Sequence, residues 1–268
     1  NGRVSHFDAP SSQFNGLGYY DMNTDGKAVG LIGFETELSG IPFIFDNGVS
    51  TIVGEKGQYM FCINDSGLIG GEDIRGWGYQ PFLYYGGQYH YLNGNAGVYG
   101  IDRVGNLCGI RTDAEGNRHA IYWRAGELDA TDLNAPGISS MARYMSQNGT
   151  IVGQSFMTNQ ANPGWRPWTY RNGVFTMLEW PDEPGAEFSL KGVTDSGQVL
   201  ADCQNYKGLV LATVLWDQGK AYNMTDMVEG NHGYVVYGSA KMSSNGKFAC
   251  GTYYNGRDTA FVFEIVPE

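Results

Sequence analysis

Some residues of this sequence have types and spacings that could bind a metal or transform a substrate. Asp21–Gly26 matches the opening of an EF-hand calcium loop, but Ile32 stands where such a loop places its last ligand, a glutamate. The four histidines show no spacing to each other, or to a cysteine, that is typical of metal ligands. Motifs for a phosphate loop, a dinucleotide site or a G-x-S-x-G nucleophile are absent. We therefore predict no metal, no cofactor and no catalytic residue from these motifs.

Aromatic residues interleaved with arginines and carboxylates recur in several stretches of the chain. An example is Glu72–Tyr79, which holds two acids, an arginine, a tryptophan and a tyrosine. Aromatic rings stack on the apolar faces of sugars, while charged side chains hydrogen-bond to their hydroxyls. The residues that we predict to bind a ligand are Glu72, Arg75, Trp77, Arg111, Trp165, Arg166, Asp202, Tyr206 and Tyr253. The alternative is that they only cap and solubilise the surface, with Trp77 and Trp165 packed on neighbouring loops.

The acidic residues allow a second interpretation, a carbohydrate-active enzyme of the glycoside hydrolase or lyase type. Glycoside hydrolysis uses two carboxyl groups about 5 to 10 Å apart, one of them with a pKa raised by burial. The acids available for such a pair are Glu35, Glu37, Glu72, Asp113 and Asp202. Their spacing in the sequence does not pair any two of them. We therefore expect a non-catalytic binding or scaffold protein and keep the enzyme, and a purely structural part of a larger assembly, as alternatives.

An internal repeat positions these residues. Each copy has an aliphatic residue, a small polar residue, two variable residues and a glycine, and successive glycines lie 38 to 49 residues apart. A period of this length is typical of a four-stranded propeller blade. The six copies are Met22–Gly26, Ile63–Gly67, Ile101–Gly105, Met145–Gly149, Val193–Gly197 and Met242–Gly246.

Two further landmarks follow each of these turns. A small residue stands four positions after the glycine, as at Gly30 and Gly153, and predicts a strand on which a neighbouring sheet packs closely. Later in each repeat comes an aromatic residue, such as Trp123, which we expect to fill the wedge between adjacent blades. We predict an all-β fold in a single domain over residues 1–268, a six-bladed β-propeller of four-stranded blades.

The last repeat ends after three predicted strands. The segment Asn1–Phe7 resembles Asn47–Ile52 and Asn172–Met177, which occupy the position of the fourth strand in their repeats. We therefore expect the N-terminal strand to complete the last blade and close the ring, which would also cover an open sheet edge. The loops between second and third strands would then carry the candidate binding residues on one face.

The overall composition limits the classes of partner. The formal net charge of −11 repels the phosphates of nucleic acids and of anionic membrane surfaces. No apolar run approaches the roughly 20 residues that cross a bilayer, so we predict no membrane insertion. We expect a monomer with four buried, free cysteines. The chain begins at Asn1 rather than at Met, which we interpret as a processed or trimmed product.

One family resemblance is carried by the fourth repeat. The segment Ser146–Gly153, followed by Pro167–Gly173 and Leu178, resembles the HAF-type extracellular repeats of bacterial proteins, and His119–Trp123 is similar. The resemblance implies an extracellular, cell-surface or periplasmic protein of unsettled activity, and it carries over no catalytic residues. The resulting hypothesis is an exported module that recognises a glycan or a protein through its loop-rich face.

Overall fold

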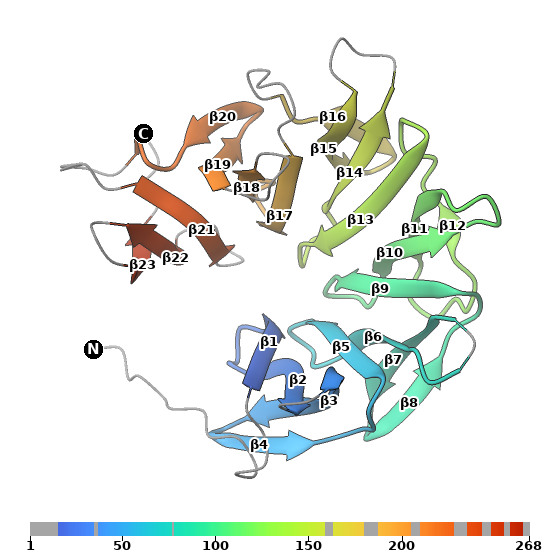
Figure 1. Cartoon of the computed structure of the whole chain (residues 1–268). Coiled ribbons are helices and arrows are strands. Elements are labelled where there is room, and N and C mark those ends of the chain that lie inside the picture. Colours follow the sequence, from blue (N-terminus) through green and yellow to red (C-terminus); the bar gives the residue numbers. More distant parts are fainter. Residues whose placement is uncertain are drawn as a thin grey trace. The chain divides into compact units, whose positions relative to one another are not determined.

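The structure is a computed structural model, and all of its regular elements are β-strands (Figure 1). It describes residues 16–34, 37–76, 78–158, 163–179, 187–204, 210–227, 235–242, 248–254 and 258–264. The all-β class predicted from the glycine-rich composition is confirmed within these residues.

The strands form successive sheets in chain order. The first three sheets contain β1 (Gly16–Met22), β2 (Ala28–Phe34), β3 (Glu37–Asp46), β4 (Val49–Ile52), β5 (Gln58–Ile63), β6 (Ile69–Asp73), β7 (Gln80–Tyr85), β8 (Gln88–Tyr91), β9 (Ala96–Ile101), β10 (Leu107–Thr112), β11 (Arg118–Trp123) and β12 (Thr131–Asp132). The remaining sheets contain β13 (Ser139–Met145), β14 (Ile151–Met157), β15 (Gly164–Arg171), β16 (Val174–Met177), β17 (Glu187–Val193), β18 (Val199–Gln204), β19 (Val210–Asp217), β20 (Lys220–Asn223), β21 (Val235–Met242), β22 (Phe248–Tyr254) and β23 (Asp258–Glu264).

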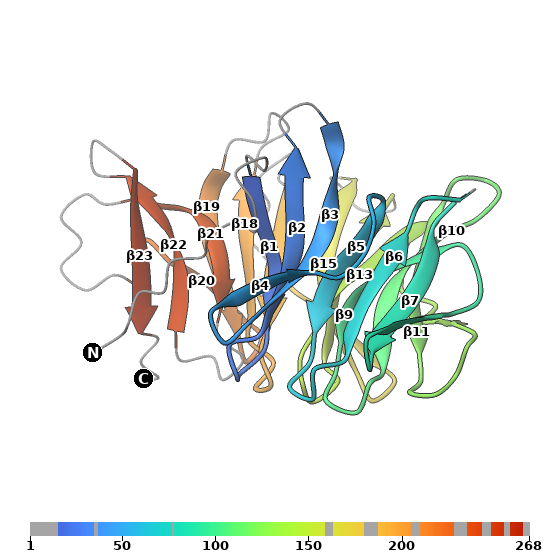
Figure 2. The same cartoon turned by 90° about the horizontal axis from the view of Figure 1, so that it is seen from below.

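Each four-stranded sheet is an antiparallel meander, the order of a propeller blade. In both cartoon views the strands β1, β2 and β3 lie side by side in this order (Figures 1 and 2). The prediction of six four-stranded blades is wrong. Within the described residues there are five such blades, and the sixth repeat contributes the three-stranded sheet β21-β22-β23. Residues 1–15, the expected source of the closing strand, lie outside the described residues.

The repeated turn motif joins the first and second strands of each four-stranded blade. Its small polar residue accepts a hydrogen bond from the backbone N–H four positions later, at 2.9 Å from Leu68 to Asn64 and 3.1 Å from Thr150 to Ser146. Its glycine has a positive φ, 83° at Gly67, which glycine adopts without the strain that a Cβ would cause. This geometry explains the sequence motif. It also makes Asp21–Gly26 a turn of the same kind, in which Asn23 accepts the hydrogen bond of Lys27.

The reason why the second strand needs a small residue at this position differs from the one that we predicted. A Cβ on Gly153 would overlap the carbonyl oxygen of Met141 in the first strand of the same blade, and the Trp168 ring in the third. The first strand bulges at this point, because its register shifts between Ala142 and Tyr144. Gly30, Gly71 and Gly109 face their own first strand in the same way. The close neighbour is therefore the strand beside the glycine and not another sheet.

The core consists of apolar clusters that join neighbouring blades. Trp123 is 1% exposed and packs in one cluster with Cys62 of β5 and Val98 of β9, and Trp216 packs with Val152 and Phe188. The wedge-filling role predicted for the repeated aromatic residue is confirmed at these two positions, whereas the equivalent Tyr84 and Tyr170 are only half-buried. Cys62, Cys108 and Cys203 are buried free thiols, and Cys250 is half-buried.

The chain divides into two compact units. The first unit contains residues 1–112 and 121–131, and the second contains residues 113–120 and 132–268. The prediction of a single domain stays a prediction. The sites below lie within one unit each.

Candidate functional site

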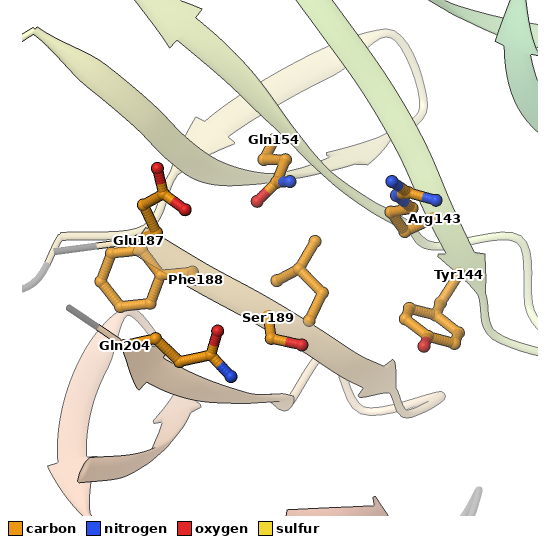
Figure 3. A pocket seen from close by; sticks show the side chains of 8 residues that line it. Arg143, Tyr144, Gln154, Glu187, Phe188, Ser189 and Gln204 are labelled. Carbon is orange, nitrogen blue, oxygen red and sulfur yellow. The ribbon is translucent and has the colours of Figure 1, made fainter. Parts of the chain in front are cut away.

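The second unit contains a cavity of about 350 Å³ between two adjacent blades (Figure 3). Strands β13 and β14 supply one wall, and strands β17 and β18 supply the other. A volume of this size lies at the small end of the range for ligand pockets, roughly 300 to 1,000 Å³. The residues that line it are Arg143, Tyr144, Gln154, Glu187, Phe188, Ser189, Leu190 and Gln204.

A β-bulge brings Arg143 to the cavity wall. The pairing of β13 with β14 passes from Ala142 to Tyr144, so Arg143 is the extra residue of the bulge. Such an extra residue bends its strand and redirects the local side chains. The strand that faces it, β17, bulges at the equivalent step between Leu190 and Gly192. The same local irregularity that requires Gly153 therefore also brings Arg143 to the cavity wall.

The lining is rich in hydrogen-bonding groups. Gln154 points its carboxamide into the cavity, and its Oε1 is buried without a hydrogen-bond donor among the described residues (Figure 3). Glu187 and Gln204 lie opposite each other in the register of β17 and β18, and Glu187 is exposed. Phe188 and Leu190 are buried and contribute the apolar part of the wall. The site can therefore bind a small polar group that has one apolar side.

A charged cluster in the first unit holds one predicted residue, Arg75. Its guanidinium contacts the Asp73 carboxylate at 2.6 Å and also pairs with Glu55. The Tyr91 hydroxyl donates to Asp73 at 2.8 Å, and the Gln58 amide does so at 3.2 Å. Burial favours a raised pKa for Asp73, but these hydrogen bonds outweigh it and hold the pKa well below its usual range. Arg75 is thus oriented by its own blade, which favours a structural role for it.

A histidine lies between two acids in the second unit. His119 Nε2 is 2.9 Å from Asp113, and Nδ1 is 3.0 Å from Asp132. Neutral imidazole has a single N–H, so both contacts are hydrogen bonds only when the ring carries two protons. The hydrogen bond with His119 is the main cause that lowers the pKa of Asp113. Because the ring occupies the space between the two acids, Asp113 and Asp132 do not form a facing catalytic pair.

The other predicted binding residues are distributed over several blades. Glu72 is buried in β6, where it lies opposite Tyr59 in the register of β5 and β6. It accepts a 3.4 Å hydrogen bond from the Tyr99 hydroxyl. Arg111 is half-buried in β10. Trp165 packs edge-on against Phe156 of β14, the adjacent strand of its own blade, with ring centroids 5.7 Å apart, and Arg166 is half-buried beside it.

Asp202 is almost completely buried, in contrast to the exposed loop position that we expected. It accepts a hydrogen bond from Thr213 at 2.9 Å and pairs with Lys191 at 3.2 Å. Its strand position explains this burial, because Asp202 lies in the middle of β18, opposite Ser189 of β17. Trp77, Tyr206 and the side chain of Tyr253 lie outside the described residues.

The cavity residues lie on strands, whereas the sequence pattern of aromatic and charged residues predicted a site on loops. None of the nine predicted binding residues is among the residues that line the cavity in the described part of the chain. One signal was available in the sequence. Arg143 and Lys191 each place a basic side chain two positions before the turn motif, at the step where both first strands bulge.

Features that would suggest other classes of site do not occur in the described ranges. No three His, Cys, Asp or Glu side chains in these ranges are arranged to hold a metal ion. Over the same residues, no helix is long and apolar enough to cross a membrane. Of the acids considered for catalysis, Glu35 and the side chain of Glu37 lie outside the described residues.

Comparison of the structure with solved structures identifies β-propellers. The β-propeller domain of the Trilobed protease from Pyrococcus furiosus matches with a TM-score of 0.62 and 11% identity, covering 92% of this chain and 82% of that one. TolB from Acinetobacter baumannii matches with a TM-score of 0.55 and 14% identity, covering 84% of this chain and 57% of that one. The Pyrococcus horikoshii acylaminoacyl peptidase matches with a TM-score of 0.58 and 11% identity, covering 92% of this chain and 44% of that one. At these identities the likeness shows the fold alone. No protein-family model and no curated protein matches the sequence.

Proposed function

We propose that this chain is a non-catalytic binding propeller that recognises a glycan or a protein. The observation that carries the proposal is the polar cavity between β13–β14 and β17–β18, with the carboxamide of Gln154 directed into it (Figure 3). Rigid strands rather than loops supply its walls, which favours a site whose geometry is already formed before the ligand arrives.

The chemistry of the lining supports binding rather than catalysis. Among the described residues that line the cavity, those with a formal charge at pH 7 are one arginine and one glutamate, and these residues do not supply the two carboxyl groups that glycoside hydrolysis uses. The acids outside the cavity, Asp113 and Asp202, are engaged by His119 and Lys191. The resemblance to HAF-type repeats supports an extracellular, cell-surface or periplasmic location, where glycans and surface proteins are available.

The test is a binding screen of the purified chain against a glycan array and a panel of surface proteins. Glu187→Lys alters the exposed carboxylate of the cavity, and Glu115→Lys makes the same charge change at the exposed turn between β10 and β11. We expect a ligand whose binding is lost in Glu187→Lys and retained in Glu115→Lys. Binding that both variants retain would place the site elsewhere, and cleavage of an array sugar would favour the enzyme alternative.

A further inference from the structure

We infer that the cavity holds a neutral sugar unit of a glycan, bound through its hydroxyl groups. This inference rests on the proposed function and chooses between its two ligand classes. It begins from Gln154, whose Oε1 is buried without a donor among the described residues. A buried acceptor without a partner costs about 1–3 kcal/mol, so the ligand that belongs in this cavity supplies a hydrogen-bond donor.

The remaining polar groups require acceptors as well as donors in the ligand. Glu187 can only accept hydrogen bonds, Arg143 can only donate, and Gln204 does both. An anionic group, which only accepts, would leave Gln154 Oε1 unpaired. An ammonium group only donates, so it could not accept a hydrogen bond from Arg143 and would bring a like charge beside it. A sugar hydroxyl donates and accepts at the same time, and it satisfies both kinds of wall group.

The charge of the site agrees with an uncharged ligand. One arginine and one glutamate are among the described residues that line the cavity, and their formal charges cancel. The whole chain carries a net charge of −11, which disfavours the approach of polyanionic chains. A neutral glycan is not repelled by this net charge.

Phe188 and Leu190 are 6% and 7% exposed, so the wall offers a small apolar area for the C–H groups of a sugar. Phe188 and Leu190 are buried in β17 on either side of Ser189, and Phe188 is held edge-on against Trp216 with ring centroids 5.5 Å apart. Sugars present C–H groups on one face of the ring, and aromatic or aliphatic side chains pack on that face. A cavity of about 350 Å³ is small for a ligand site, which indicates a terminal unit rather than a longer segment of the glycan.

The decisive substitution is Gln154→Met, which keeps the length of the side chain and removes its carbonyl. We expect wild-type protein to bind neutral oligosaccharides of hexoses or N-acetylhexosamines in preference to sialylated or uronic-acid-containing ones. Gln154→Met should weaken that binding about tenfold, because the sugar hydroxyl loses its acceptor in a buried site. The same variant should not lower the free energy of unfolding, since it removes an unpaired buried oxygen. A purely structural glutamine would not combine these two results.

The outcomes separate the inference from the proposed function. Unchanged binding of the neutral glycan by Gln154→Met would overturn the inference, and Gln204→Met is the second variant if Gln154→Met does not fold. Preference for acidic glycans, or binding of a surface protein only, with loss in Glu187→Lys, would overturn the inference while the proposed function stands. If no glycan or protein probe loses binding in Glu187→Lys, both are overturned.

Discussion

Asp73 is a buried carboxylate that keeps its charge through the side chains around it. Because its pKa is lowered in the folded protein, its stabilising effect is present above the unfolded pKa of about 3.9 and is lost as the pH falls. We expect Asp73→Asn to lower the free energy of unfolding by about 2 kcal/mol at pH 7, since Arg75 and the Tyr91 hydroxyl lose a charged partner. Urea denaturation at pH 7 and at pH 3 measures this difference, which should shrink at pH 3.

The matched control for this prediction is Asp25→Asn. Asp25 is exposed in the first turn motif, and its change should stay within about 0.5 kcal/mol at both pH values. A difference for Asp73→Asn that is equally large at pH 7 and pH 3 would contradict the role assigned to its charge.

His119 determines the titration of its neighbour Asp113. The imidazole contacts this carboxylate at 2.9 Å, and the contact lowers the pKa of Asp113. Replacing the ring by a hydrocarbon in His119→Phe removes the hydrogen bond, so the pKa of Asp113 should rise toward its usual value of about 3.9. Carbon-13 NMR of the carboxyl groups during a pH titration follows Asp113 directly. If its titration curve is the same in both proteins, the cause lies elsewhere, in the backbone N–H of Asn117 for example.

At the scale of a blade, the bulge of the first strand decides which glycines are required. Gly153→Ala would bring a Cβ against the Met141 carbonyl and the Trp168 ring. We expect this substitution to lower the free energy of unfolding by about 2 kcal/mol or more, because both neighbours are fixed in strands of the same sheet. Gly192→Ala is the control, as a Cβ there meets nothing within 4 Å. Equal effects of the two substitutions in chemical denaturation would contradict the explanation.

The blade also shows which features the sequence could predict. The turn at Asn64–Gly67 depends on a hydrogen bond between residues four apart and on a glycine with positive φ, and both leave a local pattern. The bulge at Arg143 depends on pairing with another strand, and so does the contact of Gly153 with Met141. Contacts between two strands do not produce a local pattern in the sequence of either strand. The turns were therefore predicted correctly, while the role of the glycine and the residues of the cavity were not.

At the scale of the whole chain, the repeats predicted the sheets but overestimated the number of complete blades. Five repeats contain the segments for four strands, and the sixth contributes β21, β22 and β23. The fourth strand of that sheet was assigned to the distant segment Asn1–Phe7 by resemblance to other repeats. A sequence pattern of one strand does not specify which sheet edge it joins, because any free edge offers the same backbone groups.

The net charge leads to a prediction about association in solution. At pH 7 the charge of −11 makes copies of the chain repel each other, so light scattering with size-exclusion chromatography should give a monomer of 29.4 kDa. Near the isoelectric point of about 4.7 this repulsion disappears, and we expect the mean mass to rise and the solubility to fall. Electrostatic repulsion is screened within about 10 Å at 0.1 M salt, so added salt at pH 7 should move the mass in the same direction but less. A dimer at pH 7 whose mass does not respond to salt or pH would instead indicate a specific interface between two copies, held by contacts other than charge.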